Sequence, residues 1–123
     1  MKILAVDYGK KNIGLAVSDA GRKLAFPYKT LINSDKLFEE INRIVEKEDV
    51  DRIVVGLPLS KKFGYSRQTE EVKNWAEELK KRVPVPVDFE NEIFTTKIAL
   101  RHGVKERHAA AAAILLQDYL DRF

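Results

Sequence analysis

Cysteine is absent from this chain of 123 residues. Its absence excludes disulfide frameworks, thiolate zinc sites and cysteine nucleophiles, so any metal must bind to carboxylates, histidine or water. No apolar run approaches the roughly 20 residues that span a bilayer, and the amino terminus lacks the basic, apolar and small-residue pattern of a signal peptide. We therefore expect one cytoplasmic domain over residues 1–123.

Net charge is also low. The formal value of +3 is too small to indicate a nucleic-acid partner by itself, so the distribution of the charges matters more. Basic residues cluster in predicted loops and at element ends, close to candidate carboxylates: Lys10, Lys11, Lys61, Lys62 and Arg67. These side chains are either ordinary solvated charges or contacts to a phosphate backbone.

The stretch from Ile3 to Asp19 holds an apolar run, a glycine turn and a second apolar run, which is typical of a β-hairpin. Asp7 lies at the tip of the first run. An ionised carboxylate beside apolar side chains is costly unless its charge is compensated. A bound cation would compensate the charge. Alternatively, Asp7 accepts hydrogen bonds from backbone N–H groups near Gly9, as in an Asx turn.

A third strand and an amphipathic helix are expected next. Residues 22–30 place Leu24, Phe26 and Tyr28 in alternation, while Pro27 indicates an edge strand. Ser34 is the predicted N-cap of a helix. Its apolar positions recur at helical spacing: Leu37, Phe38, Ile41, Ile44 and Val45.

The rest of the chain alternates strands and helices. It predicts a buried strand over 52–58, a helix from about residue 69, an edge strand over 84–89, a short helix that ends at Gly103, and a final helix from about residue 106. This order predicts an α/β fold, a mixed five-stranded sheet with helices on both faces. Ligands of such sheets bind at the carboxyl ends of strands, so Asp7, the loop after Pro58 and Glu92 should share one rim.

Four segments in this order resemble a known family: Asp7–Gly9 with Ile13–Val17, Val55–Leu59, Asn91–Thr96 and Ala111–Leu120. Together they closely resemble the YqgF or RuvX family, which has the ribonuclease H-like fold. Its members were first labelled Holliday-junction resolvases and are now described as candidate nucleases that mature the 5′ end of pre-16S ribosomal RNA. The resemblance implies a metal-dependent nuclease acting on precursor rRNA, with branched DNA as the alternative substrate.

The resemblance also implies site residues. Asp7 matches the first-strand acid of the family, and Glu92 matches the acid of its second motif, although Asn91 and Ile93 replace the flanking Asp and Arg. The family's third acid falls on His108. Two Mg²⁺ or Mn²⁺ ions, about 3.5–4 Å apart in such sites, would then bind to Asp7, Glu92 and His108. The clustered basic residues would contact phosphates.

Two other classes of protein remain open at this point. The Asp-x-Gly hairpin also opens the sugar kinase, Hsp70 and actin superfamily, which binds ATP between two lobes, whereas a chain of 123 residues has room for one. A catalytically silent nucleic-acid-binding module is the second alternative. Because a four-way junction has two-fold symmetry, its resolution would need a dimer; we expect a monomer or a weak homodimer.

Overall fold

The computed structural model describes residues 1–57, 67–91 and 107–122, with Arg67 and Asn91 described for their backbone only. The predicted basic loop after Pro58 and the short helix that ends at Gly103 lie outside these ranges. The elements follow one another as β1 (Lys2–Asp7), β2 (Asn12–Ser18), β3 (Ala25–Ile32), α1 (Leu37–Lys47), β4 (Val50–Leu57), α2 (Arg67–Arg82), β5 (Val87–Asn91) and α4 (Arg107–Leu120).

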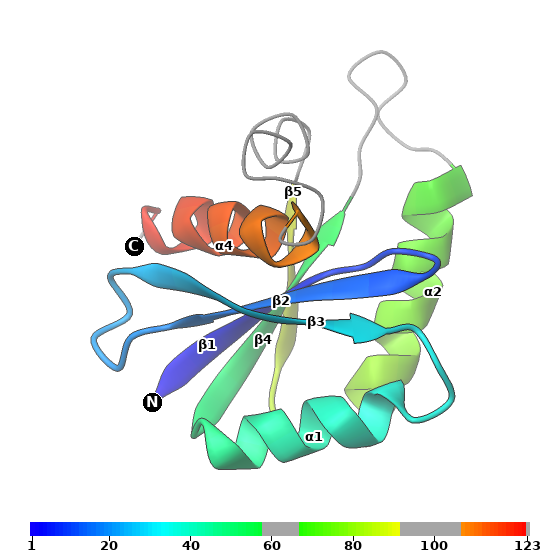
Figure 1. The fold of residues 1–123 in the computed structure, drawn as a ribbon, viewed down its shortest axis with the longest axis horizontal. Coiled ribbons are helices and arrows are strands. Elements are labelled where there is room, and N and C mark those ends of the chain that lie inside the picture. Colours follow the sequence, from blue (N-terminus) through cyan, green and yellow to red (C-terminus); the bar gives the residue numbers. More distant parts are fainter. Residues whose placement is uncertain (58–66, 92–106, 123) are drawn as a thin grey trace.

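The strands form one five-stranded sheet in the order β3-β2-β1-β4-β5, which Figure 1 shows as a twisted fan. β2 is antiparallel to both β1 and β3, whereas β4 is parallel to both β1 and β5. The predicted mixed sheet is therefore confirmed, and β3 and β5 are its edges. Pro84 and Pro86 precede β5, and the Pro86 carbonyl accepts a hydrogen bond from Ile53 N at 2.9 Å.

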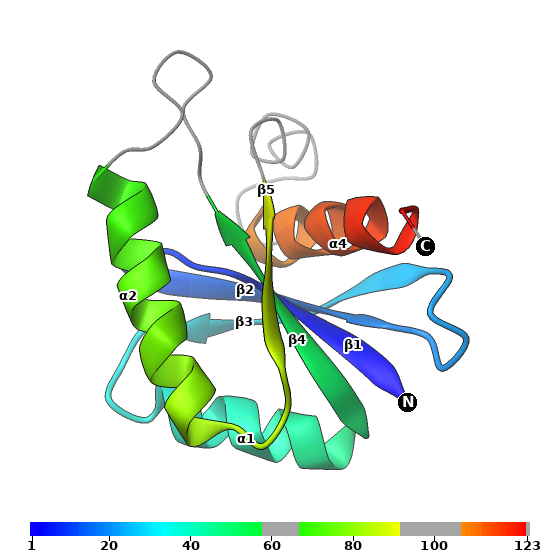
Figure 2. The same cartoon turned by 180° about the vertical axis from the view of Figure 1, so that it is seen from behind.

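Helices cover both faces of the sheet. Because side chains alternate along a strand, Ile3 and Ala5 of β1 pack under α4, whereas Leu4 and Val6 join the core under α1 and α2. The two opposite views show α4 on one side and α1 with α2 on the other (Figures 1 and 2). Among the described residues, no helix has the length and apolar character needed to cross a membrane.

Strand β3 corrects one prediction from the sequence. Leu24, which precedes the strand, is 55% exposed, and Phe26 is 50% exposed. The pairing of β3 with β2 shifts by one residue between Leu15 and Ala16, so that Tyr28 is the extra residue of a bulge. Such a bulge breaks the alternation of side chains, and the strict period of two expected from the sequence does not hold here.

The start of α1 corrects another prediction. The residue at the N-cap is Lys36, and its side chain makes no capping hydrogen bond. Ser34 lies two residues earlier, where its hydroxyl accepts a hydrogen bond from Lys36 N at 3.3 Å. Serine hydroxyls favour such turns as well as helix caps, so the turn takes the place of the cap.

Candidate active site

Asp7 is the last residue of β1 and is half-buried at the carboxyl end of the strand. It follows Ile3 and Ala5 in the alternation, so its side chain lies on the α4 face of the sheet. The carboxyl ends of the parallel strands β1, β4 and β5 meet at the same rim (Figure 1). The structure therefore places Asp7 where ligands of open α/β sheets bind.

Gly14 connects Asp7 to helix α4. The two residues are paired in the β1–β2 ladder, and paired antiparallel residues have Cα atoms about 4.5–5.5 Å apart and side chains on one face. A Cβ added at Gly14 would lie 1.9 Å from the carbonyl oxygen of His108 and 2.9 Å from the backbone nitrogen of Ala109. Only glycine permits this approach, which brings the first turn of α4 next to Asp7.

His108 is the second residue of α4 and is half-buried. The following residues Ala109–Ala112 are all buried, because their small side chains let the helix lie against the sheet. The first turn of α4 contains no acidic residue. The imidazole of His108 is therefore the side chain of this turn that could hold a metal ion close to Asp7.

The other predicted site residues are placed as follows. Lys10 and Lys11 are exposed in the connection between β1 and β2, at the same end of the sheet as Asp7. Arg67 begins α2, and its side chain is not described. Glu92, Lys61 and Lys62 lie outside the described residues. Within the described ranges, no three Asp, Glu or His residues form a metal-binding group.

Glu90 is an acidic residue that the sequence analysis did not single out. It pairs with Gly56 of β4, and the parallel register of Val6 with Val55 puts Asp7, Gly56 and Glu90 in one row across the sheet. Glu90 is only 3% exposed and forms an ion pair with Arg122. Its charge is thus compensated from within the protein, which indicates a structural role. In the sequence, the spacing of Asp88 and Glu90 by two residues is the pattern that predicts that both acids lie on one face of β5.

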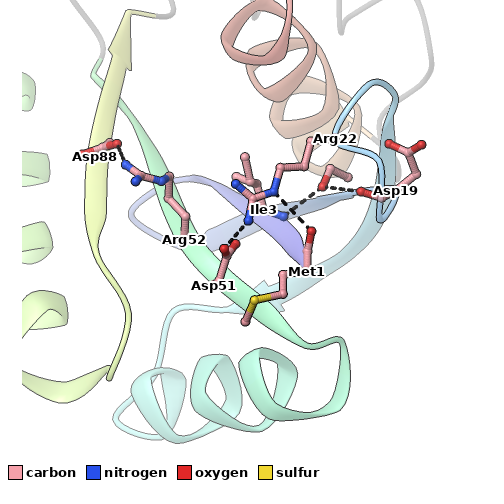
Figure 3. Close-up of polar contacts among 8 residues, drawn as sticks. Met1, Ile3, Asp19, Arg22, Asp51, Arg52 and Asp88 are labelled. Atoms are coloured by element: carbon pink, nitrogen blue, oxygen red, sulfur yellow. Dashed lines mark hydrogen bonds and ion pairs between the residues drawn. The ribbon is translucent and has the colours of Figure 1, made fainter. Parts of the chain in front are cut away.

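A cavity of about 530 Å³ lies on the α4 face at the opposite end of the strands from Asp7. Two arginines line it, and Figure 3 shows Arg22 directed toward Asp51 and Arg52 directed toward Asp88. Burial and a hydrogen bond to Asp88 raise the pKa of Tyr119, which also lines this cavity. Since each guanidinium already pairs with a carboxylate, this cavity is a poor site for a polyanion.

Comparison with known proteins adds to this geometry. Residues 1–122 match the family model RuvX, described as Holliday junction resolvase. A protein of Maridesulfovibrio salexigens named "Putative pre-16S rRNA nuclease" is 36% identical, with 99% of each chain covered. A protein of the same name from Chloroflexus aurantiacus is 38% identical, and the match covers 97% of this chain and 86% of that relative.

Solved structures share the fold at low sequence identity. RuvC of T. thermophilus in complex with a Holliday junction substrate superposes with a TM-score of 0.63 at 14% identity, covering 99% of this chain and 95% of that one. The fowlpox virus resolvase, in complex with Holliday junction DNA, gives 0.59 at 14% identity, with 99% and 98% covered. These likenesses establish the ribonuclease H-like α/β fold.

The family match extends over nearly the whole chain, whereas only the hairpin motif indicated the kinase and actin superfamily. An ATP-binding member of the kinase and actin superfamily is no longer supported. The structure agrees with the family match over residues 1–122. The strand order is the expected one, and α4 closely approaches the paired residues Asp7 and Gly14. This chain belongs to the RuvX family.

Proposed function

We propose that this protein is a metal-dependent nuclease that hydrolyses phosphodiester bonds in precursor 16S rRNA. The observation that carries the proposal is the juxtaposition of Asp7 with the first turn of α4 at the carboxyl rim of the sheet. The substrate class comes from the names of the relatives. The exposed lysines of the β1–β2 connection lie at the same end and would bind phosphates without reading sequence.

The donors suit a divalent cation. Asp7 offers carboxylate oxygens and His108 offers an imidazole nitrogen, a set that binds Mn²⁺ well and Mg²⁺ less well. Asp7 and Glu92 would hold the ions through carboxylate oxygens, and His108 would hold one through an imidazole nitrogen. When bound, such ions supply a nucleophilic water and stabilise the leaving oxygen. Asp7 holds its position because it ends a strand that is paired on both sides.

Branched DNA is the second candidate substrate. The family model is described as Holliday junction resolvase, and a four-way junction has two-fold symmetry that matches a dimer rather than a monomer. The test for this alternative is the oligomeric state on the junction together with the products. Symmetric paired nicks would favour resolution of a junction, whereas cleavage of precursor RNA by a monomer would favour rRNA processing.

The decisive experiment compares Asp7→Asn with Asp118→Asn. Asp118 is an exposed acid on α4, so its variant is matched in chemistry but lies away from the rim. Labelled precursor RNA and a four-way junction are incubated with each protein in Mg²⁺, Mn²⁺ or EDTA. We expect Asp7→Asn to abolish cleavage and Asp118→Asn to retain it, while both variants keep their fold by circular dichroism. Full activity of Asp7→Asn would overturn the proposed site.

A further inference from the structure

A groove of about 300 Å³ lies between the edge strand β3 and helix α1, on the opposite face of the sheet from α4. The charged and aromatic side chains that line it are Tyr28, Lys29, Glu40, Arg43 and Lys47. Three cations face one carboxylate, so the groove has a net positive charge. A volume of this size is at the lower end for binding pockets and suits a single strand better than a duplex.

The cations of this groove lack the close carboxylate partners that several other described cations have. Lys29, Arg43 and Lys47 make no salt bridge within the ranges that are described. On α2, by contrast, Lys80 pairs with Glu77 at 3.2 Å and Lys81 with Glu78 at 3.9 Å. Unpaired cations gathered in one groove provide charge for an external polyanion, which paired cations do not.

An exposed aromatic ring lies on the same face of β3. Phe26 is paired with Val17, which is paired in turn with Leu4 of the core under α1 and α2. Its ring therefore lies on the groove side of the sheet and is 50% exposed. Single-stranded nucleic acids bind to surfaces that combine a positively charged groove with exposed aromatic rings, because bases stack on those rings.

The groove and Asp7 lie on opposite faces of the sheet, and two strands separate Asp7 from the β3 edge. Thr30 of β3 pairs with Gly14, which pairs with Asp7, so Asp7 lies about 10 Å, or two strand spacings, from the edge. Asn33 follows β3 and binds the lysine-bearing hairpin: its N–H donates to Lys11 O at 2.9 Å and its Nδ2 donates to Gly9 O at 3.0 Å. Asn33 thus ties the connection that carries the exposed Lys10 and Lys11 to the end of β3.

We propose that the groove between α1 and β3 binds a single-stranded RNA segment of the substrate, which leaves the active site and passes around the β3 edge. Lys29, Arg43 and Lys47 neutralise its phosphates, and Phe26 stacks on a base. This inference rests on the proposed nuclease function and adds to it a second contact with the substrate. It implies that substrates with a single-stranded flank bind more tightly than those without one.

The test measures binding of a labelled single-stranded RNA of about twelve nucleotides, a length within reach of such grooves, in EDTA so that nothing is cleaved. R43Q/K47Q is compared with K80Q/K81Q, since each removes two positive charges from one helix. We expect R43Q/K47Q to weaken binding about tenfold at low salt. It should lower the salt slope by about 1.4, or 0.7 for each lost phosphate contact, whereas K80Q/K81Q should behave as the unmodified protein.

Phe26→Thr tests the stacking contact separately. We expect about five- to tenfold weaker binding with an unchanged salt slope, because stacking releases no counterions. Binding of a duplex of the same length should change less than twofold in all variants. Equal losses in R43Q/K47Q and K80Q/K81Q would overturn the inference, as would a loss confined to the duplex.

Cleavage separates this inference from the proposed function. If the unmodified protein cleaves precursor RNA but R43Q/K47Q binds single strands normally, the groove proposal is wrong and the nuclease proposal stands. If binding depends on the groove but no metal supports cleavage, the groove proposal stands and the nuclease proposal is wrong.

Discussion

Gly14 and His108 are in backbone contact across the sheet and helix: a Cβ at Gly14 would lie 1.9 Å from the carbonyl oxygen of His108. Gly14 is also the ladder partner of Asp7. The missing side chain at this one position therefore sets the distance between the strand-end carboxylate and the helix that bears the imidazole.

Gly14→Ala should destabilise the protein and reduce cleavage together. The added methyl group must displace the start of α4, and overpacking of this kind costs about 1–3 kcal/mol. Chemical denaturation gives the free energy of unfolding, and cleavage of labelled RNA gives the rate. Gly21→Ala is the matched control, because its Cβ would have only Asp19 Oδ2 at 3.4 Å; we expect its effect to stay within about 0.5 kcal/mol. Equal effects of the two substitutions would contradict this role of Gly14.

His108 should determine which metal the site prefers. Because imidazole suits Mn²⁺ better than Mg²⁺, we expect activity to favour Mn²⁺. His108→Asp should strengthen Mg²⁺ binding and raise Mg²⁺-dependent cleavage, since it adds an anionic ligand in the first turn of α4, where negative charge is favourable. His108→Ala should lower both. Isothermal titration of the three proteins with each metal measures the affinities, and equal affinities would leave His108 as a structural residue of the helix.

The predicted basic contacts should bind nucleic acid without reading its sequence. Substitution of Lys10, Lys11, Lys61, Lys62 and Arg67 by glutamine should weaken binding similarly for unrelated sequences. The salt slope should fall by about 0.7–0.9 for each phosphate contact that is lost. Fluorescence anisotropy at several salt concentrations measures both quantities. If binding were weakened for one sequence only, or if the salt slope stayed unchanged, the substrate would have to bind at another surface.

Low pH should weaken a set of side-chain hydrogen bonds, here called a cross-link, that joins β1, β3 and the end of α1. Glu48 accepts hydrogen bonds from Lys2 Nζ and from the Tyr28 hydroxyl, both at 3.1 Å. The bond from Lys2 lowers the pKa of Glu48 below its ordinary value of 4.5. A lowered pKa in the folded state stabilises the protein above pH 4.5, and this contribution is lost as the pH falls through the lowered pKa.

Lys2→Met tests this cross-link. At pH 7 the substitution should lower the free energy of unfolding by up to about 1 kcal/mol, and the difference from the unmodified protein should shrink below pH 4.5. Lys81→Met is the control, because Lys81 is 75% exposed and lies 3.9 Å from Glu78, so that this pair should contribute little at any pH. A difference for Lys2→Met that stays constant from pH 7 to pH 3 would show that Glu48 is not its source.

Periodicity in the sequence determined most of the fold. Two apolar runs around a glycine turn predicted the β1–β2 hairpin, and helical spacing predicted α1, whose Leu37 and Ile41 are buried. The continuous run of β4 predicted a strand covered on both faces, and its side chains indeed join the cores on both sides of the sheet. These features depend on the local periods of strands and helices, which are two and 3.6 residues. They can therefore be predicted without knowing which elements pack together. Asp7 at a strand end followed from the same pattern.

Only the tertiary structure decided the features that depend on pairing between distant residues. The bulge at Tyr28 arises from the register of β3 on β2, and it turns Phe26 to the face of the sheet that carries the basic groove. The role of Gly14 appears only when α4 packs on the sheet. The sequence shows 22 lysines and arginines but not which of them lack a carboxylate partner. Register, packing distance and charge pairing are long-range properties, and a local pattern constrains them weakly.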